Sequence, residues 1–320
     1  MQAEQMFVGV DVGKATLVMC VHGTTAHQSV ANELGPIARW LKTLPAHAVV
    51  AMESTGRYHV TLARLAHGSG RAVYVLNAKD VYFYAKALGA RSKTDRVDAQ
   101  VIGRYVAEHH GALHAWSPGS AAQEQVQTLL QRRARLVDHR TSIHQLVRGL
   151  PLQPAVGDLE ASFEALLAQI DHLVEAQLSS EPQLSGKRAL LHTITGLGPR
   201  GSALLAALMS RIGFANADAL IAYSGLDPRA NDSGAKNGLR RLSKRGNAAL
   251  RRQMYLAAFS AAHSKTLGPT YRAIKARGFA PTQALVILAR KLLRIAWAVY
   301  KTSTPFDPAR FAPPLPCAST

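Results

Sequence analysis

The sequence has few cysteines and no long apolar segment. Its two cysteines, Cys20 and Cys317, lie near opposite ends of the 320 residues. They therefore form neither a metal-binding pair nor a disulfide framework, which suits a reducing cytoplasm. No apolar run approaches the ~18–20 residues that a membrane span needs. The first residues also lack the basic segment of a signal peptide. We expect a cytoplasmic protein that has no membrane partner.

Acidic residues are almost missing from the C-terminal part of the chain. The segment from Ser233 to Thr320 has one acidic residue, Asp307, against sixteen lysines and arginines, and the whole chain carries a formal net charge of +18. Because neutralising a phosphate releases condensed counterions, this excess favours a nucleic-acid partner. Binding to an anionic membrane is less favoured, since the basic segment is not one amphipathic helix.

Hydrophobic spacing divides the chain into a mixed first third and a helical remainder. In the first third the order of elements predicts a mixed sheet covered by helices: strands at 7–12, 15–21, 27–31, 48–52 and 71–76, and helices at 35–44, 60–66, 81–88 and 95–109.

After a break at 116–119, helices at 123–147 and 159–178 have the pattern of an antiparallel coiled-coil arm. Pro151, Pro154 and Gly157 separate them, and the chain from Gly186 onward is predicted to be all-helical. The predicted fold is therefore α/β plus all-α. We expect the parts to be 1–115, a helical arm at 116–185, a helical domain at 186–303 and a flexible tail at 304–320.

Four carboxylates fall at the ends of predicted elements. Asp11 ends the first strand, Glu53 follows the fourth, and Asp95 and Asp98 share one face at the start of a helix. Each alone has an ordinary explanation as a turn residue or helix cap. Together they would repel one another unless a divalent cation lay between them. Oxygen ligands suit Mg²⁺ or Mn²⁺, which supports phosphodiester chemistry.

The basic region offers a nucleophile and phosphate contacts. Ser233 lies in a turn, and its hydroxyl could attack phosphorus if a base or metal removed its proton; the alternative is a solvent-facing or capping serine, and Ser243 is the nearest competitor. Gly196 and Gly198 suit a helix-hairpin-helix turn against a phosphate, although an ordinary corner explains them equally well. The predicted cationic contacts are Lys14, Lys93, Lys236, Arg240, Arg241, Lys244, Arg245, Arg251 and Arg252. No aromatic series suggests base stacking.

Five motifs follow one another in a fixed order: Gly-Val-Asp11-Val-Gly-Lys14, Glu53-Ser-Thr-Gly-Arg-Tyr58, Lys93-Thr-Asp95-Arg-Val-Asp98-Ala99, Gly196-Leu-Gly198, and Ser233-Gly234 with Arg241-Leu-Ser-Lys-Arg-Gly246 and Leu250-Arg-Arg252. Through them, nearly the whole chain resembles the DEDD transposases of the IS110 family, which include the Piv-type DNA invertases. The resemblance implies a RuvC-like, ribonuclease-H-like N-terminal nuclease domain, a coiled-coil arm and a C-terminal transposase domain.

The same resemblance implies roles for particular residues. Asp11, Glu53, Asp95 and Asp98 would be the DEDD metal ligands, and Ser233 would form a covalent link to a DNA 5′ end, with the metal site supplied by a different subunit. Many relatives have Ser-Gly-Ser here, whereas this chain has Ala235 at the third position. The expected partners are donor and target double-stranded DNA, a structured noncoding guide (bridge) RNA, and further copies of the chain in a homodimer or homotetramer. The expected location is the bacterial cytoplasm, with the nucleoid.

Two other functions fit parts of the sequence. Gly9-Val-Asp11-Val-Gly13 resembles the first phosphate loop of an actin-like kinase or ATPase, but the second such loop that this fold requires is missing. A RuvC-like junction nuclease would use the same acids, yet it would cut DNA without forming a protein–DNA adduct.

Overall fold

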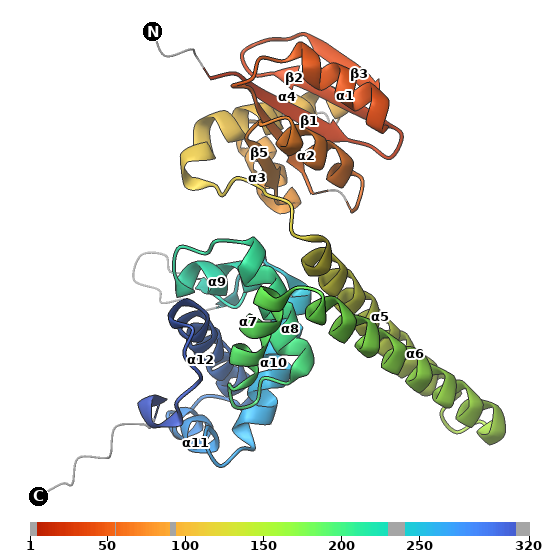
Figure 1. The fold of residues 1–320 in the computed structure, drawn as a ribbon, viewed down its shortest axis with the longest axis vertical. Helices are drawn as coiled ribbons and strands as arrows, with labels where there is room; N and C mark the ends of the chain where they lie inside the picture. The colour runs from red at the N-terminus through yellow and green to blue at the C-terminus, as the bar shows by residue number, and fades with distance from the viewer. Residues whose placement is uncertain (1–4, 55, 90–93, 230–240, 312–320) are drawn as a thin grey trace, which may run out of the picture. The chain divides into compact units, whose positions relative to one another are not determined.

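The computed structural model describes residues 5–54, 56–89, 94–229 and 241–311 (Figure 1). The chain forms two compact units, Met1–Pro118 and Gly119–Thr320. Predicted site residues that lie outside the described residues are Lys93, Ser233, Lys236 and Arg240. Among the helices that the structure describes, none has the length and apolarity to cross a membrane.

A five-stranded mixed sheet forms the centre of the first unit, in the order β3-β2-β1-β4-β5. Its strands are β1 (Phe7–Val12), β2 (Thr16–Val21), β3 (His27–Ala31), β4 (Val49–Glu53) and β5 (Val73–Leu76). β1, β2 and β3 pair antiparallel, whereas β4 runs parallel to β1 and β5 parallel to β4. This order confirms the predicted mixed sheet and is consistent with a ribonuclease-H-like fold.

Helices cover both faces of this sheet, which is why β1 and β4 are apolar along most of their length. On one face, Val10 and Met52 pack with residues of α1 (Leu34–Thr43) and α2 (His59–Gly68). On the other face, Ala51 packs with residues of α3 (Ala78–Ala87) and α4 (Asp95–His109). A short 3-10 turn, η1 (His110–Ala112), follows α4.

Two glycines bring α4 unusually close to β1. A Cβ atom on Gly9 would lie 2.1 Å from the Ala99 carbonyl oxygen and 2.2 Å from the Gly103 nitrogen. Since Cβ atoms do not approach backbone this closely, Gly9 must be glycine for the helix to pack here. Packing against α4 therefore explains Gly9 without a phosphate loop.

A pair of long helices begins the second unit, α5 (Ala121–Val147) and α6 (Gln153–Ser179), which extend side by side in Figure 1. Pro154 and Gly157 were expected to lie between the helices, but α6 contains both. Pro154 stands in the first turn of α6, where a missing N–H leaves no intrahelical hydrogen bond unmade. Arg133 of α5 donates two hydrogen bonds to Asp171 of α6, at 2.7 and 3.1 Å.

The remaining helices surround α8, in which every residue from Gly201 to Met209 is buried. They are α7 (Pro182–His192), α8 (Pro199–Arg211), α9 (Ala217–Ser224), α10 (Ala248–Ala262), α11 (Gly268–Ala276), α12 (Pro281–Thr302) and the 3-10 turn η2 (Pro308–Phe311). Phe306 falls in the segment expected to be a flexible tail, but its side chain is buried in this core and its N–H donates to Thr193 Oγ1.

The region from Gly186 onward is helical, as expected, except that one pair of two-residue strands interrupts the helices. β6 (Pro228–Arg229) pairs antiparallel with β7 (Arg241–Leu242). Two glycines beside this pair pack closely, because a Cβ on Gly246 would lie 2.4 Å from the Gly225 nitrogen. The pairing holds together the two ends of the segment that contains Ser233.

Candidate active site

Asp11 and Glu53 occupy neighbouring strand ends. In the parallel register of β1 and β4, Val10 lies opposite Met52, and Asp11 and Glu53 are the next residue of each strand. Successive side chains of a strand point to opposite faces. Val10 and Met52 point into the core beneath α1 and α2, so Asp11 and Glu53 point toward the face that α4 covers.

Asp95 and Asp98 lie in the first turn of α4. The Thr94 side chain caps this helix by accepting a hydrogen bond from the Val97 N–H at 3.3 Å. Asp95 is exposed and Asp98 is half-buried. Thr94 therefore supplies the cap of this helix.

The electrostatics of Asp11 show that the four acids share one region. Burial, followed by the negative charges of Asp95, Asp98 and Glu53, raises the pKa of Asp11 from 3.8 to about 6, while a hydrogen bond to the Val12 backbone lowers it. The structure thus places the other three predicted acids within electrostatic range of Asp11. Without a cation, their mutual repulsion opposes ionisation of Asp11.

The donor chemistry of this region fits a divalent cation. Carboxylate oxygens from two strand ends and a helix are the ligands that Mg²⁺ or Mn²⁺ takes. Among the residues that the structure describes, no group of three or more acidic, histidine or cysteine side chains lies close enough together to hold a metal ion. Mg²⁺ usually keeps several waters and needs only one or two direct carboxylates, so an open arrangement of this kind is compatible with it.

Asn32, which the sequence analysis did not identify, joins the two loops that carry the first acidic motifs. Its Nδ2 donates to the Gly13 carbonyl at 3.0 Å and to the Tyr58 carbonyl at 3.1 Å. Its backbone N–H donates to the Ala15 carbonyl at 2.9 Å. Asn32 therefore ties the turn after β1 to the loop after β4. An asparagine after a strand reads as an ordinary loop residue, so no local signal pointed to it.

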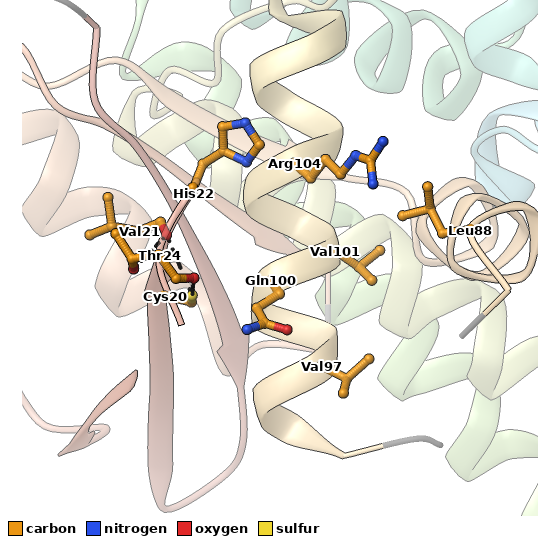
Figure 2. Close-up of a pocket in the computed structure, with 10 residues that line it drawn as sticks. Cys20, Val21, His22, Thr24, Leu88, Val97, Gln100, Val101 and Arg104 are labelled. Atoms are coloured by element: carbon orange, nitrogen blue, oxygen red, sulfur yellow. Dashed lines mark hydrogen bonds between the residues drawn. The ribbon is translucent and has the colours of Figure 1, made fainter. Parts of the chain in front are cut away.

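A cavity of about 300 Å³ lies on the same side of the sheet, between β2, α4 and the end of α3 (Figure 2). Its described lining holds no carboxylate, so it is separate from the four acids. Cys20 lies at its inner wall, where burial raises the pKa of the thiol. Leu88, just past the end of α3, faces Val97 and Val101 of α4 across the cavity.

In the second unit, two of the predicted DNA-binding arginines have partners within the protein. Arg251 donates to the Ser224 carbonyl at 3.1 Å, and Arg252 forms an ion pair with Asp138 at 2.7 Å. Both therefore help to hold α10 in place. Arg241 of β7 and Lys244 just after it are exposed, and Arg245 is half-buried. In the first unit Lys14 is exposed in the turn after β1.

Ser243 and the predicted phosphate turn also have structural roles. The Ser243 hydroxyl donates a hydrogen bond to the Asp227 carboxylate. Gly196 has a left-handed φ of +90°, and a Cβ there would lie 2.5 Å from the Ala257 carbonyl oxygen, so packing against α10 requires this glycine. Gly198 has open space around it and caps α8. Phosphate contacts by these glycines stay a prediction.

Comparisons with known proteins find transposases and a gene-inverting protein among the relatives of this chain. A family model described as "Transposase", of the DEDD IS110 type, matches residues 8–152, and one described as "Transposase IS116/IS110/IS902 family" matches residues 188–273. The chain is 27% identical to the pilin gene-inverting protein of Moraxella bovis, covering 94% of this chain and 97% of the relative. It is 25% identical to a probable family 20 transposase of Pseudomonas aeruginosa, covering 94% and 98%.

Proposed function

The chain belongs to the IS110/IS116/IS902 family of transposases, and on that premise we propose that it cuts and rejoins DNA through a metal-assisted serine nucleophile. The observation that supports this most directly is the shared electrostatic region of Asp11, Glu53, Asp95 and Asp98. Acids so placed would hold Mg²⁺ or Mn²⁺ against a phosphodiester, as in a RuvC-like nuclease domain.

In the proposed reaction the Ser233 hydroxyl attacks the phosphorus atom. The bond from phosphorus to the 3′ oxygen breaks, the 3′ oxygen leaves as a hydroxyl with the proton that the serine gives up, and the 5′ end stays bound as a phosphoserine. A 3′ hydroxyl from another strand then attacks this phosphoserine and returns the serine. The bound cation would stabilise the charge that develops on the oxygens in both steps. Because phosphodiester energy is conserved, strands rejoin without ATP.

The environment of the Ser233 segment supports this role. β6 and β7 hold its two ends together, and Arg241 of β7 and Lys244 just after it are exposed. Cations beside the segment would clamp the phosphate backbone and position it for attack. Ser243 is the competing nucleophile, since its hydroxyl already donates to a carboxylate that could accept its proton.

The partners of the reaction are part of the same proposal. We expect donor and target DNA, a structured noncoding RNA that selects them, and a homodimer or homotetramer in which one subunit's acids serve another subunit's serine. Three leucines on α6, at intervals of seven residues, are exposed and support contact with a second copy: Leu159, Leu166 and Leu173. RNA guidance follows from the family resemblance, and omitting the RNA from the reaction tests it.

The decisive experiment detects the covalent intermediate. The protein is incubated with its element's DNA ends, the candidate RNA and Mg²⁺, and DNA-linked protein is sought on a denaturing gel. We expect an adduct with the unaltered chain and with Ser243→Ala, and none with Ser233→Ala. An adduct that survives in Ser233→Ala contradicts the serine assignment. Mg²⁺-dependent cutting that leaves no adduct indicates a junction nuclease instead.

A second variant in the same experiment tests the proposed metal site. Asp11→Asn is expected to abolish cutting while DNA binding persists, because the substitution removes a ligand and leaves the basic second unit unchanged. Full cutting by Asp11→Asn would show that the four acids are not the metal site.

A further inference from the structure

One face of α3 exposes aromatic rings where a surface helix usually has polar side chains. Tyr82 and Phe83 are 53% and 51% exposed, and their rings contact edge-to-face with centroids 5.4 Å apart. Exposed lysines flank them one turn away on each side, at Lys79 and Lys86. The helical spacing of these four residues places them on one surface, here termed the aromatic–lysine stripe. This pair of rings is not evident from the sequence, because the sequence does not show which rings are exposed.

The inner face of α3 packs against the core of the first unit. Val81, Tyr84 and Ala85 face the core beside α4, where the Tyr84 ring packs against Tyr105 at 5.0 Å. The Tyr84 hydroxyl donates to Glu108 at 2.5 Å. Two large rings on the opposite face add apolar surface in water, which folding alone does not favour.

The charge around the rings identifies the kind of partner. Lys86 Nζ lies over one face of the Tyr82 ring, 4.7 Å from the ring centroid, so a cation is in direct contact with the aromatic pair. Rings that stack on bases, next to cations that neutralise phosphates, are the features by which proteins hold unpaired nucleic acid. A symmetric contact with a second copy is disfavoured, because it would bring like-charged lysines of both copies together.

The stripe lies on the helix that leads to the acidic site. Leu88 at the end of α3 faces Val97 and Val101 of α4 (Figure 2), and α4 begins with Asp95. The end of α3 therefore lies beside the turns of α4 that follow the two aspartates. We propose that the aromatic–lysine stripe stacks unpaired bases of the DNA strand that enters the acidic site. The inference rests on the proposed function for the identity of that strand.

The test measures binding by fluorescence anisotropy, in EDTA so that no cutting occurs. The probes are a labelled single-stranded DNA of mixed sequence, the blunt duplex of the same length, and the corresponding single-stranded RNA. For Tyr82→Ala with Phe83→Ala we expect affinity for the single-stranded DNA to fall about 10- to 100-fold, as loss of stacking predicts, and affinity for the duplex to fall less than about threefold. Tyr82→Phe, which keeps the ring, should bind like the unaltered protein.

A matched control separates stacking from general damage. Phe259→Ala removes an aromatic ring that is also 53% exposed, on α10 of the other unit, and should leave single-stranded binding unchanged. Lys86→Gln should lower the slope of log affinity against log salt by about 0.7 for the single strand.

Three results would overturn the proposal. They are equal losses on single strand and duplex, tighter binding of RNA than DNA with the same dependence on the rings, or a double variant that changes the oligomeric state and leaves DNA binding intact. Because binding is measured without metal, the proposal can fail or hold independently of whether the adduct forms.

Discussion

Asp11 is a carboxylate of the site whose pKa is raised by burial and by the neighbouring acids. Its pKa of about 6 means that, in the metal-free protein, the native state holds a proton that the unfolded chain has lost between pH 3.8 and 6. Ionising Asp11 in the native state therefore opposes folding. The stability that the raised pKa contributes is present below about pH 4 and is lost as pH rises through 6.

For Asp11→Asn we expect a more stable metal-free protein at pH 7.5, by about 1–2 kcal/mol once solvent screening of the half-buried group is allowed for. The gain over the unaltered chain should vanish near pH 4. Mg²⁺ should stabilise the unaltered protein and not the variant. Thermal unfolding at both pH values, with and without Mg²⁺, measures this. As a control, Asp158→Asn, at an exposed site on α6, should neither raise the stability at pH 7.5 nor abolish the stabilisation by Mg²⁺. If Asp11→Asn is no more stable than the unaltered chain at pH 7.5, the mutual repulsion is contradicted.

Asn32 is distant in the sequence from Asp11 and Glu53, but it joins the loops that follow them. Asn32→Ala removes two hydrogen bonds and should lower the free energy of unfolding by about 1–3 kcal/mol. It should also weaken Mg²⁺ binding, since the loops after Asp11 and Glu53 are no longer joined. Asn216→Ala, which removes a cap of α9, should reduce stability without changing the Mg²⁺ titration. Equal Mg²⁺ affinities in the two variants would assign Asn32 a purely structural role.

At the scale of elements, hydrophobic periodicity predicted the five strands and the four helices of the first unit, because each buries a continuous apolar face. The four acids were selected because they fall at or near the ends of those elements, and their role as metal ligands stays a prediction. The close approach of α4 at Gly9, the clamp of Asn32 and the exposure of Tyr82 depend on tertiary packing, which periodicity does not contain. The start of α6 was misplaced because Pro154 can either interrupt a helix or open one.

Asp171 of α6 links the paired helices α5 and α6 to α8. Burial raises its pKa, but hydrogen bonds from Arg200 and Arg133 outweigh this and hold the pKa of the carboxyl below its usual value. Arg200 lies at the start of α8, so one carboxylate connects α5, α6 and α8. The outward leucines of α6 are therefore carried on a well-anchored helix.

We predict that Leu166→Glu combined with Leu173→Glu produces a smaller assembly in sedimentation velocity. Both leucines are exposed, so the change should alter the unfolding free energy by less than about 0.5 kcal/mol. Leu34→Glu, at an exposed site in the first unit, serves as the control and should leave the assembly unchanged. An unaltered sedimentation coefficient in the double variant would exclude this face as the subunit contact.

At the scale of the whole molecule, the net charge of +18 should dominate affinity for duplex DNA. We expect affinity to fall steeply and linearly on a plot of log affinity against log salt, with the slope reduced by about 0.9 for each cation removed. Arg241→Gln and Lys244→Gln should each show this reduction. Arg251→Gln should instead lower stability, because its guanidinium donates to the Ser224 carbonyl. Salt-independent binding would be incompatible with phosphate clamping by the second unit.

The length of α5 and α6 has a consequence for spacing along DNA. Each helix has 27 residues, which at ~1.5 Å per residue spans about 40 Å. A B-form duplex covers about twelve base pairs in that distance, at ~3.4 Å each. If two copies meet along the leucines of α6, the length of the paired helices sets the distance between the helical cores of their second units. Deleting seven residues from each helix would then shorten that distance by about 10 Å, which equals about three base pairs of duplex.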